Sequence, residues 1–350
     1  MKHLLFLIIL FLSFTIEAQK QDFKHINFEK ADSIAHSYQG YSLNNLPILT
    51  YKLTQNLDTQ VEQFRAIYTW VCSNIESDHS FGEVTLRKRK KLKNDSLSFL
   101  NWNSKVLPKV FERLLNDKKT ICTGYAYLIK EMAALVDIDC EIVDGYSRTT
   151  RRNVSDVDFP NHSWNTVKLN NNWYLVDATM ASGYFDMDKN KFVKDYNDGY
   201  FFAEPDLFLK RNYPINSKWL LTENKITLNQ FVEAPIVYGK TFKHAITPIV
   251  PKVLITEIVV NEALFFKFKI SEETKIESIR LVLSSGLRRK TIKVNHSNYD
   301  NGSVELEHHF TKKGHYDIHL MVNTDIVVSY TVKVDNRRSN HTTYTSLRTE

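Results

Sequence analysis

The sequence contains few cysteines, and none of them are closely paired. Its 350 residues include only Cys72, Cys122 and Cys140, with no C-x-x-C motif. This spacing argues against a structural zinc site. Because the count is odd, an exported form of the protein keeps at least one free thiol. Cys72 and Cys140 could pair, but both lie in apolar sequence, and we expect two buried free thiols instead.

Long apolar runs are also scarce. Residues 4–16 form a nearly unbroken apolar run, but a membrane span needs about 20 residues. The run follows a basic start and precedes Glu17-Ala18-Gln19, so we predict a signal peptide at residues 1–18 rather than a membrane anchor. No later stretch predicts a span. We therefore expect a secreted or periplasmic protein with no transmembrane segment after signal cleavage.

Several other features are missing. The sequence shows no internal repeat, no calcium-binding loop and no nucleic-acid-binding motif. The formal net charge is +6, and much of the excess lies at residues 87–93. This basic segment could bind an anionic partner, but we interpret it as a solvated surface and expect no nucleic acid partner. We also expect no cofactor and no metal.

What is present is typical of a globular chain with two domains. Apolar residues make up 43% and charged residues 25%, which is enough apolar surface for packed cores. The length predicts about two domains. We expect a first domain of mixed helices and strands at residues 20–245. We expect a β-rich second domain at 250–335 and a loose tail at 336–350.

The first domain begins with helices and then becomes mixed. Apolar residues at helical spacing predict four helices, and the basic segment 84–98 interrupts their pattern. Residues 186–240 are aromatic and irregular, and we expect them to wrap back onto this domain. The four helices are predicted at 26–38, at 46–57, from Asp58 to Ile75 and at 106–115. A helix at 121–136 and strands near 140–147, 162–169 and 173–179 are predicted to follow.

The second domain alternates apolar and polar residues over short segments separated by turns. This pattern predicts an immunoglobulin-like β-sandwich. The stretch from Phe310 through Gly314 to Tyr316 resembles the approach to a tyrosine corner. Strands are expected at 253–260, 264–270, 276–284, 289–294, 303–309, 315–322 and 326–334.

The first chemical motif is a cysteine at the start of a helix. Thr120 can cap the helix that follows, so Cys122 falls in the first turn, where the helix dipole and free N–H groups favour a thiolate. The same N–H groups could hold a developing oxyanion. Gly124 leaves room for the close approach of another backbone. A cysteine that simply packs at a helix start is the alternative interpretation.

The second motif is a β-hairpin that carries a histidine and an aspartate. Residues 161–169 and 173–179 alternate as strands around the turn residues 170–172. If Leu169 pairs with Asn172, His162 becomes the diagonal neighbour of Asp177, within reach of a hydrogen bond. Cys122 would then attack an acyl carbonyl, His162 would move its proton, and Asp177 would orient His162 and stabilise its charged form.

These motifs resemble the transglutaminase-like superfamily, and they look most like its kyphoscoliosis-peptidase and cytokinesis-protein branch. The pattern in that branch is roughly C-x-G-Y-A, N-H-A-W-N and W-Y-x-x-D-A-T-W. The chain has C-T-G-Y-A, N-H-S-W-N and W-Y-L-V-D-A-T-M. The likeness extends over about 45–240. Met180 stands where Trp is usual, and Asn212 where His is common.

The resemblance implies an α+β fold with a papain-like transglutaminase core. Together with the residue patterns, the expected fold is this core with an N-terminal helical part, followed by the immunoglobulin-like β-sandwich. It implies a Cys-His-Asp triad of Cys122, His162 and Asp177. Trp164 and Tyr125 lie beside these residues and are candidate substrate-binding residues, with core packing as the alternative.

On function, the sequence predicts an exported cysteine-type peptidase or transglutaminase-like acyltransferase. Its substrate would be a protein or peptide, such as one of the cell envelope. The competing hypothesis is a non-catalytic cell-envelope binding or scaffold module with a relic triad.

Overall fold

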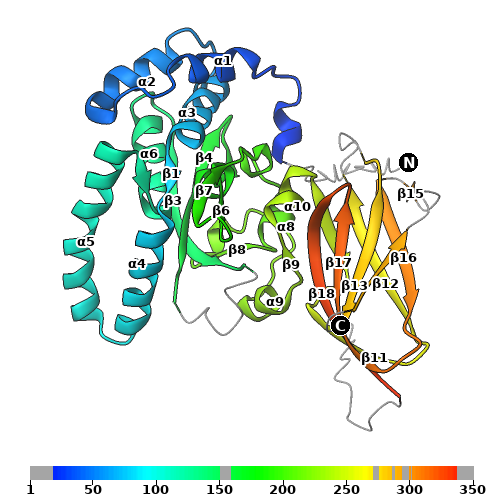
Figure 1. Ribbon diagram of the computed structural model, residues 1–350. Helices are drawn as coiled ribbons and strands as arrows, with labels where there is room; N and C mark the ends of the chain where they lie inside the picture. Colours follow the sequence, from blue (N-terminus) through cyan, green and yellow to red (C-terminus); the bar gives the residue numbers. More distant parts are fainter. Residues whose placement is uncertain are drawn as a thin grey trace, which may run out of the picture.

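The computed structural model describes residues 19–149, 159–270, 276–285, 288–293, 299–300 and 302–336. The predicted signal peptide at 1–18 and the predicted tail beyond Asn336 lie outside the described residues. Of the described residues, 39% are helical and 33% lie in strands, with most helices in the N-terminal part and long strands in the C-terminal part (Figure 1). Of the helices that the structure describes, none combines the length and the apolarity needed to cross a membrane.

The N-terminal part is built around one buried helix, α3. The sequence predicted Asp58 as its cap, but the cap is Thr59. The Thr59 hydroxyl accepts the Glu62 N–H at 3.2 Å, and the Glu62 carboxylate accepts the Thr59 N–H at 3.2 Å, which is a capping box. The elements here are η1 (Gln19–Phe23), α1 (Glu29–Ser37), η2 (Leu43–Asn45), α2 (Leu46–Thr54) and α3 (Gln60–Asn74).

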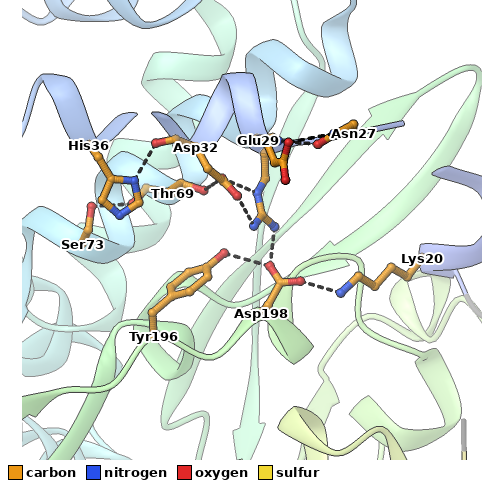
Figure 2. Close-up of polar contacts among 10 residues, drawn as sticks. Lys20, Asn27, Glu29, Asp32, His36, Thr69, Ser73, Tyr196 and Asp198 are labelled. Atoms are coloured by element: carbon orange, nitrogen blue, oxygen red, sulfur yellow. Dashed lines mark hydrogen bonds and ion pairs between the residues drawn. The ribbon is translucent and has the colours of Figure 1, made fainter. Parts of the chain in front are cut away.

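A charged residue, Arg65, lies inside this helical part. Its side chain is 7% exposed and donates to both carboxylate oxygens of Asp32 on α1, at 2.7 and 2.9 Å, and to Asp198. Figure 2 shows that Asp198 also accepts from the Tyr196 hydroxyl, at 3.0 Å, and from Lys20, at 2.5 Å. The network therefore ties η1, α1 and α3 to a segment more than a hundred residues later.

Two long helices follow where the sequence predicted an interruption. The basic segment 84–98 was expected to break the helical pattern, but α4 (His79–Leu92) runs through most of it and α5 (Ser96–Asp117) begins within it. Asp78 caps α4 through the Phe81 N–H at 3.0 Å, and Asp95 caps α5 through the Ser98 N–H at 3.0 Å. Lys and Arg favour helices, so a charge run without apolar periodicity is still helical. Figure 1 shows α4 and α5 side by side.

A four-stranded antiparallel sheet forms the centre of the first domain, in the order β5-β4-β3-β8. Helix α6 (Cys122–Ala134) packs on β3 and β4, and the Asn165 amide donates to the Ala126 carbonyl at 2.9 Å. The short strands β1 (Glu76–Ser77) and β2 (Lys119–Thr120) pair in parallel just before α6. The sheet strands are β3 (Cys140–Ser147), β4 (His162–Leu169), β5 (Asn172–Val176) and β8 (Asn212–Pro214).

Edge strand β5 is covered by the N-terminal turn η1. The Gln19 side chain accepts from the Leu175 N–H at 2.8 Å and donates to the Trp173 carbonyl at 3.1 Å. The Tyr174 hydroxyl donates to Asp22 at 2.8 Å. The start of the described chain is thereby bound to a strand about 155 residues later. The Gln19 side chain bonds backbone groups of β5 as a neighbouring strand would.

The aromatic segment after β5 packs against the helical part. Phe201 lies 6.2 Å from Phe64 and 5.0 Å from Tyr68 between ring centroids, and β8 joins the central sheet beside β3. The elements of this region are α7 (Ala178–Ala181), β6 (Gly183–Asp186), β7 (Lys191–Lys194), η4 (Asp198–Tyr200), α8 (Pro205–Phe208), η5 (Ser217–Trp219), α9 (Leu228–Glu233), β9 (Ile236–Val237) and α10 (Gly239–Lys243).

Two sheets form the C-terminal part, in the orders β10-β12-β16-β15 and β11-β18-β17-β13-β14. The sequence missed β10 and β9, and β9 pairs with β18. Phe266 and Tyr330 join the two sheets, with ring centroids 5.5 Å apart, and the Tyr316 hydroxyl donates to the Lys312 carbonyl at 2.8 Å. The strands are β10 (Ile246–Val250), β11 (Ile255–Val259), β12 (Ala263–Ile270), β13 (Ile279–Ser285), β14 (Arg288–Lys293), β15 (Tyr299–Asp300), β16 (Ser303–His309), β17 (Gly314–Val322) and β18 (Asp325–Asp335).

Candidate active site

Cys122 is the first residue of α6 and its side chain is partly exposed. The predicted cap, Thr120, does not cap the helix; Ile121 occupies the cap position and supplies no side-chain hydrogen bond. The Asp78 N–H donates to the Thr120 carbonyl at 2.8 Å, which holds the strand that leads into the helix. No side chain caps the first turn, and the Gly124 N–H donates to the Ile121 carbonyl at 2.9 Å. The Cys122 and Thr123 N–H groups, which precede the first i→i−4 bond of the helix, are the ones that could face an anion at the thiol.

Gly124 is required by the tight start of α6. A Cβ atom at this position would lie 1.9 Å from the Thr120 hydroxyl oxygen and 2.9 Å from the Thr120 Cβ. The sequence predicted a close approach of another backbone at Gly124. The structure shows a close approach, but it comes from the Thr120 side chain two residues before Cys122.

The hairpin β4–β5 brings His162 and Asp177 together. Leu169 pairs with Asn172, which confirms the predicted register. His162 Nε2 lies 2.7 Å from Asp177 Oδ2, and both side chains are buried. Asp177 also caps α7 by accepting the Met180 N–H on its other oxygen at 3.0 Å. With Nε2 engaged by Asp177, Nδ1 is the imidazole nitrogen left to serve Cys122.

The electrostatics of the three groups favour a thiolate and a charged imidazole. Burial alone would raise the pKa of Cys122, but the hydrogen bond and charge of His162, the Arg89 guanidinium and the Ser163 N–H lower this pKa to about 7. Burial opposes a charge on His162, but Asp177 and the thiol together raise the pKa of His162 to about 10. Between about pH 7 and about pH 10, Cys122 is therefore a thiolate and His162 an imidazolium.

The other two thiols are free and buried, as the sequence predicted. Burial raises the pKa of Cys72 well above its ordinary value and that of Cys140 to about 12. At neutral pH Cys122 is therefore the thiol with appreciable thiolate character. Within the described residues, no group of three or more His, Cys, Asp and Glu side chains could hold a metal ion.

The two predicted substrate-binding residues are buried beside the site. Trp164 is 1% exposed, and a Cβ at Gly145 would lie 2.4 Å from its ring, so Trp164 packs against the backbone of β3. Tyr125 is also 1% exposed, and its hydroxyl donates to the Ile75 carbonyl at 2.9 Å. This placement favours core packing for both side chains, the alternative that the sequence left open.

Sequence reasoning missed the role of Asn212. This residue is fully buried on β8, and its amide donates to Asp177 Oδ2 at 3.2 Å. The resemblance marked Asn212 only as a departure from a common histidine. No local motif connects β8 with β5, so the contact could be found only from the fold.

Replacing Asn212 by aspartate tests this contact with an isosteric change. The donor becomes an acceptor beside a buried carboxylate, and we expect the free energy of unfolding at pH 7 to fall by about 2 kcal/mol. Repulsion raises the pKa of the new carboxyl group, so the loss should shrink as the pH falls and the group becomes a donor again. Urea unfolding at pH 5 and pH 7 measures both effects. Equal losses at the two pH values would contradict the assignment.

These features define a mixed α+β domain in which a helix-borne thiol meets a strand-borne imidazole and carboxylate. The family model that matches is the transglutaminase-like superfamily, over residues 48–178. This part of the chain is a transglutaminase-like domain, and its similarities support the kyphoscoliosis-peptidase and cytokinesis-protein branch.

Three curated relatives show the extent of that similarity. Kyphoscoliosis peptidase of Homo sapiens is 33% identical over 209 residues, which is 58% of this chain and 28% of the relative. Cytokinesis protein 3 of Schizosaccharomyces pombe is 32% identical over 200 residues, 55% of this chain and 20% of the relative. Hillarin of Drosophila melanogaster is 23% identical over 235 residues, 63% of this chain and 26% of the relative. The chain thus spans between 20% and 28% of the lengths of these relatives.

Proposed function

We propose that the chain is an exported thiol enzyme that acts on peptide or amide acyl groups through Cys122, His162 and Asp177. The observation that carries this proposal is the 2.7 Å contact of His162 with Asp177 beside a helix-terminal thiol whose pKa is lowered to about 7. A nucleophile, a base and a group that orients the base are the parts that acyl transfer needs.

The reaction would proceed in two steps through a thioester. The Cys122 thiolate attacks the acyl carbonyl, and the first-turn N–H groups of α6 stabilise the oxyanion. The His162 imidazolium protonates the leaving amine as the C–N bond breaks. Neutral His162 then removes a proton from water, or from a second amine, which attacks the thioester and expels the Cys122 thiolate, so that the thiolate–imidazolium pair forms again. Water gives hydrolysis and an amine gives acyl transfer.

The name of the human and mouse relatives, kyphoscoliosis peptidase, favours hydrolysis as the first activity to test. For the rest of the chain we propose export after cleavage near residue 18 and a first domain at 20–245. We propose an immunoglobulin-like second domain at 250–335. The two sheets and the Tyr316 hydroxyl bonded to the Lys312 carbonyl support that assignment. Such a domain would serve contact with a protein partner, such as one of the cell envelope.

The competing proposal is a non-catalytic binding or scaffold module with a relic triad. Cytokinesis protein 3 and hillarin, two of the relatives, carry names that state no peptidase activity. In this reading Cys122 would keep its place at the start of α6 without forming a thioester.

Trapping of the acyl-enzyme separates the two proposals. The full chain is incubated with a peptide library, quenched in acid and analysed by mass spectrometry, with Cys122→Ala as the matched variant. An active enzyme gives a mass increase equal to a peptide acyl group, located on Cys122 and absent from Cys122→Ala. Cys140→Ala, which removes a buried thiol, should retain the adduct. The absence of any acyl adduct on Cys122 across the library would support the scaffold proposal.

A further inference from the structure

A positively charged side chain, Arg89, lies beside the candidate active site. It belongs to the basic segment that the sequence led us to interpret as a solvated surface. Arg87, Lys88 and Lys91 are exposed, as expected, but Arg89 is half-buried and its Nε atom is fully buried. One residue of the basic segment therefore points inward.

The start of α4 is anchored to the chain that leads into Cys122. The Asp78 N–H donates to the Thr120 carbonyl at 2.8 Å, and Arg113 pairs with the Asp78 carboxylate at 2.5 Å. A Cβ at Gly82 would lie 3.6 Å from the Ile121 side chain, so this face of α4 contacts the residue before Cys122. The helix is thus held in place beside the thiol.

Helical spacing places Arg89 on that same face. Gly82, Thr85 and Arg89 are three and then four residues apart, which puts them in one row. Side chains on a helix lean toward its N-terminus, so Arg89 extends back toward the level of Thr85, on the face of α4 that contacts Ile121. Its charge is one of the groups that lower the pKa of the Cys122 thiol, which agrees with this position.

Arg89 has no carboxylate partner within the part of the chain that the structure describes. Its buried Nε has no hydrogen-bond partner, and neither does the buried hydroxyl of Thr85. Arg65 and Arg113, by contrast, both pair with aspartates. A buried donor without a partner costs roughly 1–3 kcal/mol, and more when it is charged. An anion bound between α4 and the start of α6 would remove this cost.

We propose that Arg89 binds a carboxylate of the substrate beside the acyl group that Cys122 attacks, with the Thr85 hydroxyl as a second donor. The inference rests on the proposed function and adds a substrate class to it: peptides with an acidic group near the reacting bond. That carboxylate can be an acidic side chain or the C-terminus of the peptide. The guanidinium suits either, since both offer two oxygens to its paired N–H groups.

Two alkylating reagents test the charge preference without requiring catalysis. Iodoacetate is anionic and iodoacetamide is neutral, and both alkylate the Cys122 thiol. Arg89→Gln should lower the ratio of the iodoacetate rate to the iodoacetamide rate at Cys122 by about tenfold, which corresponds to one charge-assisted contact. Arg87→Gln, an equal change of charge on the exposed side of α4, should change the ratio by less than about twofold.

Arg89→Lys, which keeps the charge, should retain most of the iodoacetate preference, and thermal unfolding of each variant confirms that it is folded. If Arg89→Gln slows both reagents by the same factor, Arg89 stabilises only the thiolate and the proposal is wrong. Equal ratios in the parent, Arg89→Gln and Arg87→Gln also overturn it. In the parent, the preference should weaken as salt is added.

Matched peptides identify the source of the carboxylate. In the first pair, both peptides have capped ends and one carries Glu where the other carries Gln. In the second pair, the peptides have the same sequence, and one has a free C-terminus where the other is amidated. In one of the two pairs, the acidic peptide should acylate Cys122 faster than its neutral partner, and this difference should disappear in Arg89→Gln. That pair identifies the source of the carboxylate. Equal acylation rates within both pairs contradict the proposal. If no peptide forms an adduct but the reagent ratio still falls in Arg89→Gln, the anion site stands and the proposed enzymatic function fails.

Discussion

In the His162→Ala variant, the pH at which Cys122 ionises is expected to move from about 7 to 9 or above. The hydrogen bond and the charge of His162 are the largest of the contributions that lower the pKa of the thiol to about 7, against an ordinary value of 9.0. Without them the burial of Cys122 raises the pKa. At pH 7 the thiolate fraction then falls from about a half to about 1% or less.

The consequences for reactivity and for catalysis differ in size. A thiolate of higher pKa is intrinsically more nucleophilic, so alkylation by iodoacetamide at pH 7 should fall by only about tenfold. Acylation by a peptide loses general acid catalysis as well, and should fall by about 10³-fold or more.

The iodoacetamide rate measured from pH 5 to pH 10 gives the midpoint directly. Cys72 and Cys140 do not interfere, because burial raises the pKa of both thiols. His309→Ala, on an exposed strand of the C-terminal part, is the control and should keep the midpoint near 7. A midpoint that also stays near 7 in His162→Ala would show that the imidazole does not activate the thiol.

Replacing Arg65 by methionine should lower the free energy of unfolding by about 3 kcal/mol, the low end of what the loss of one partner from a buried ion pair costs. The change keeps an unbranched stem that can fill part of the space but removes the guanidinium, and so leaves Asp32 and Asp198 without their shared cation. We expect a loss at the low end of that range because the side chains of Asp32 and Asp198 are 29% and 37% exposed, so water can solvate their carboxylates. Lys20 also remains beside Asp198.

Urea unfolding at pH 7 measures this loss, with Arg87→Met as the control at an exposed position. Asp32→Asn and Asp198→Asn, added to Arg65→Met, should recover most of the lost stability, because no buried charge is then left unpaired. A loss below about 1 kcal/mol in Arg65→Met would contradict a central role for the network.

The same network predicts the direction of the pH dependence. Burial opposes ionisation of Asp198, but Arg65 and Lys20 outweigh it and hold the pKa of Asp198 below its ordinary value of 3.8. A depressed pKa in the folded state contributes stability above pH 3.8 that is lost as the pH falls through the folded value. The parent should therefore lose stability in acid more steeply than Arg65→Met.

The parts of the site that are local in sequence were predictable. Alternation on both sides of the turn 170–172 predicted the hairpin, but its register was an assumption, because three turn Asn residues allow alternatives. The structure has the assumed register, and His162 lies beside Asp177. A helix at 121–136 with Cys122 in its first turn was predicted, and α6 begins at Cys122. The cap was wrong because the Thr120 side chain lies against Gly124 instead of the helix N–H groups.

The parts that depend on distant contacts were not predictable. Asn212 meets Asp177 only because β8 returns to the edge of the sheet beside β3. Arg89 resembles its exposed basic neighbours in sequence, and the packing of Gly82 on Ile121 decides which of them turns inward. Helix α4 was not predicted because its run of charged residues lacks apolar residues at helical spacing.

The Gln19 side chain has a consequence for the solubility of the folded protein. Strand β5 ends the central sheet, and an open strand edge can pair with a second molecule. The two bonds from Gln19 to Trp173 and Leu175 occupy backbone groups on that edge. A chain shortened past residue 19 would expose them, so trimming the start by a few residues would favour association between molecules even if the thiol site were unchanged.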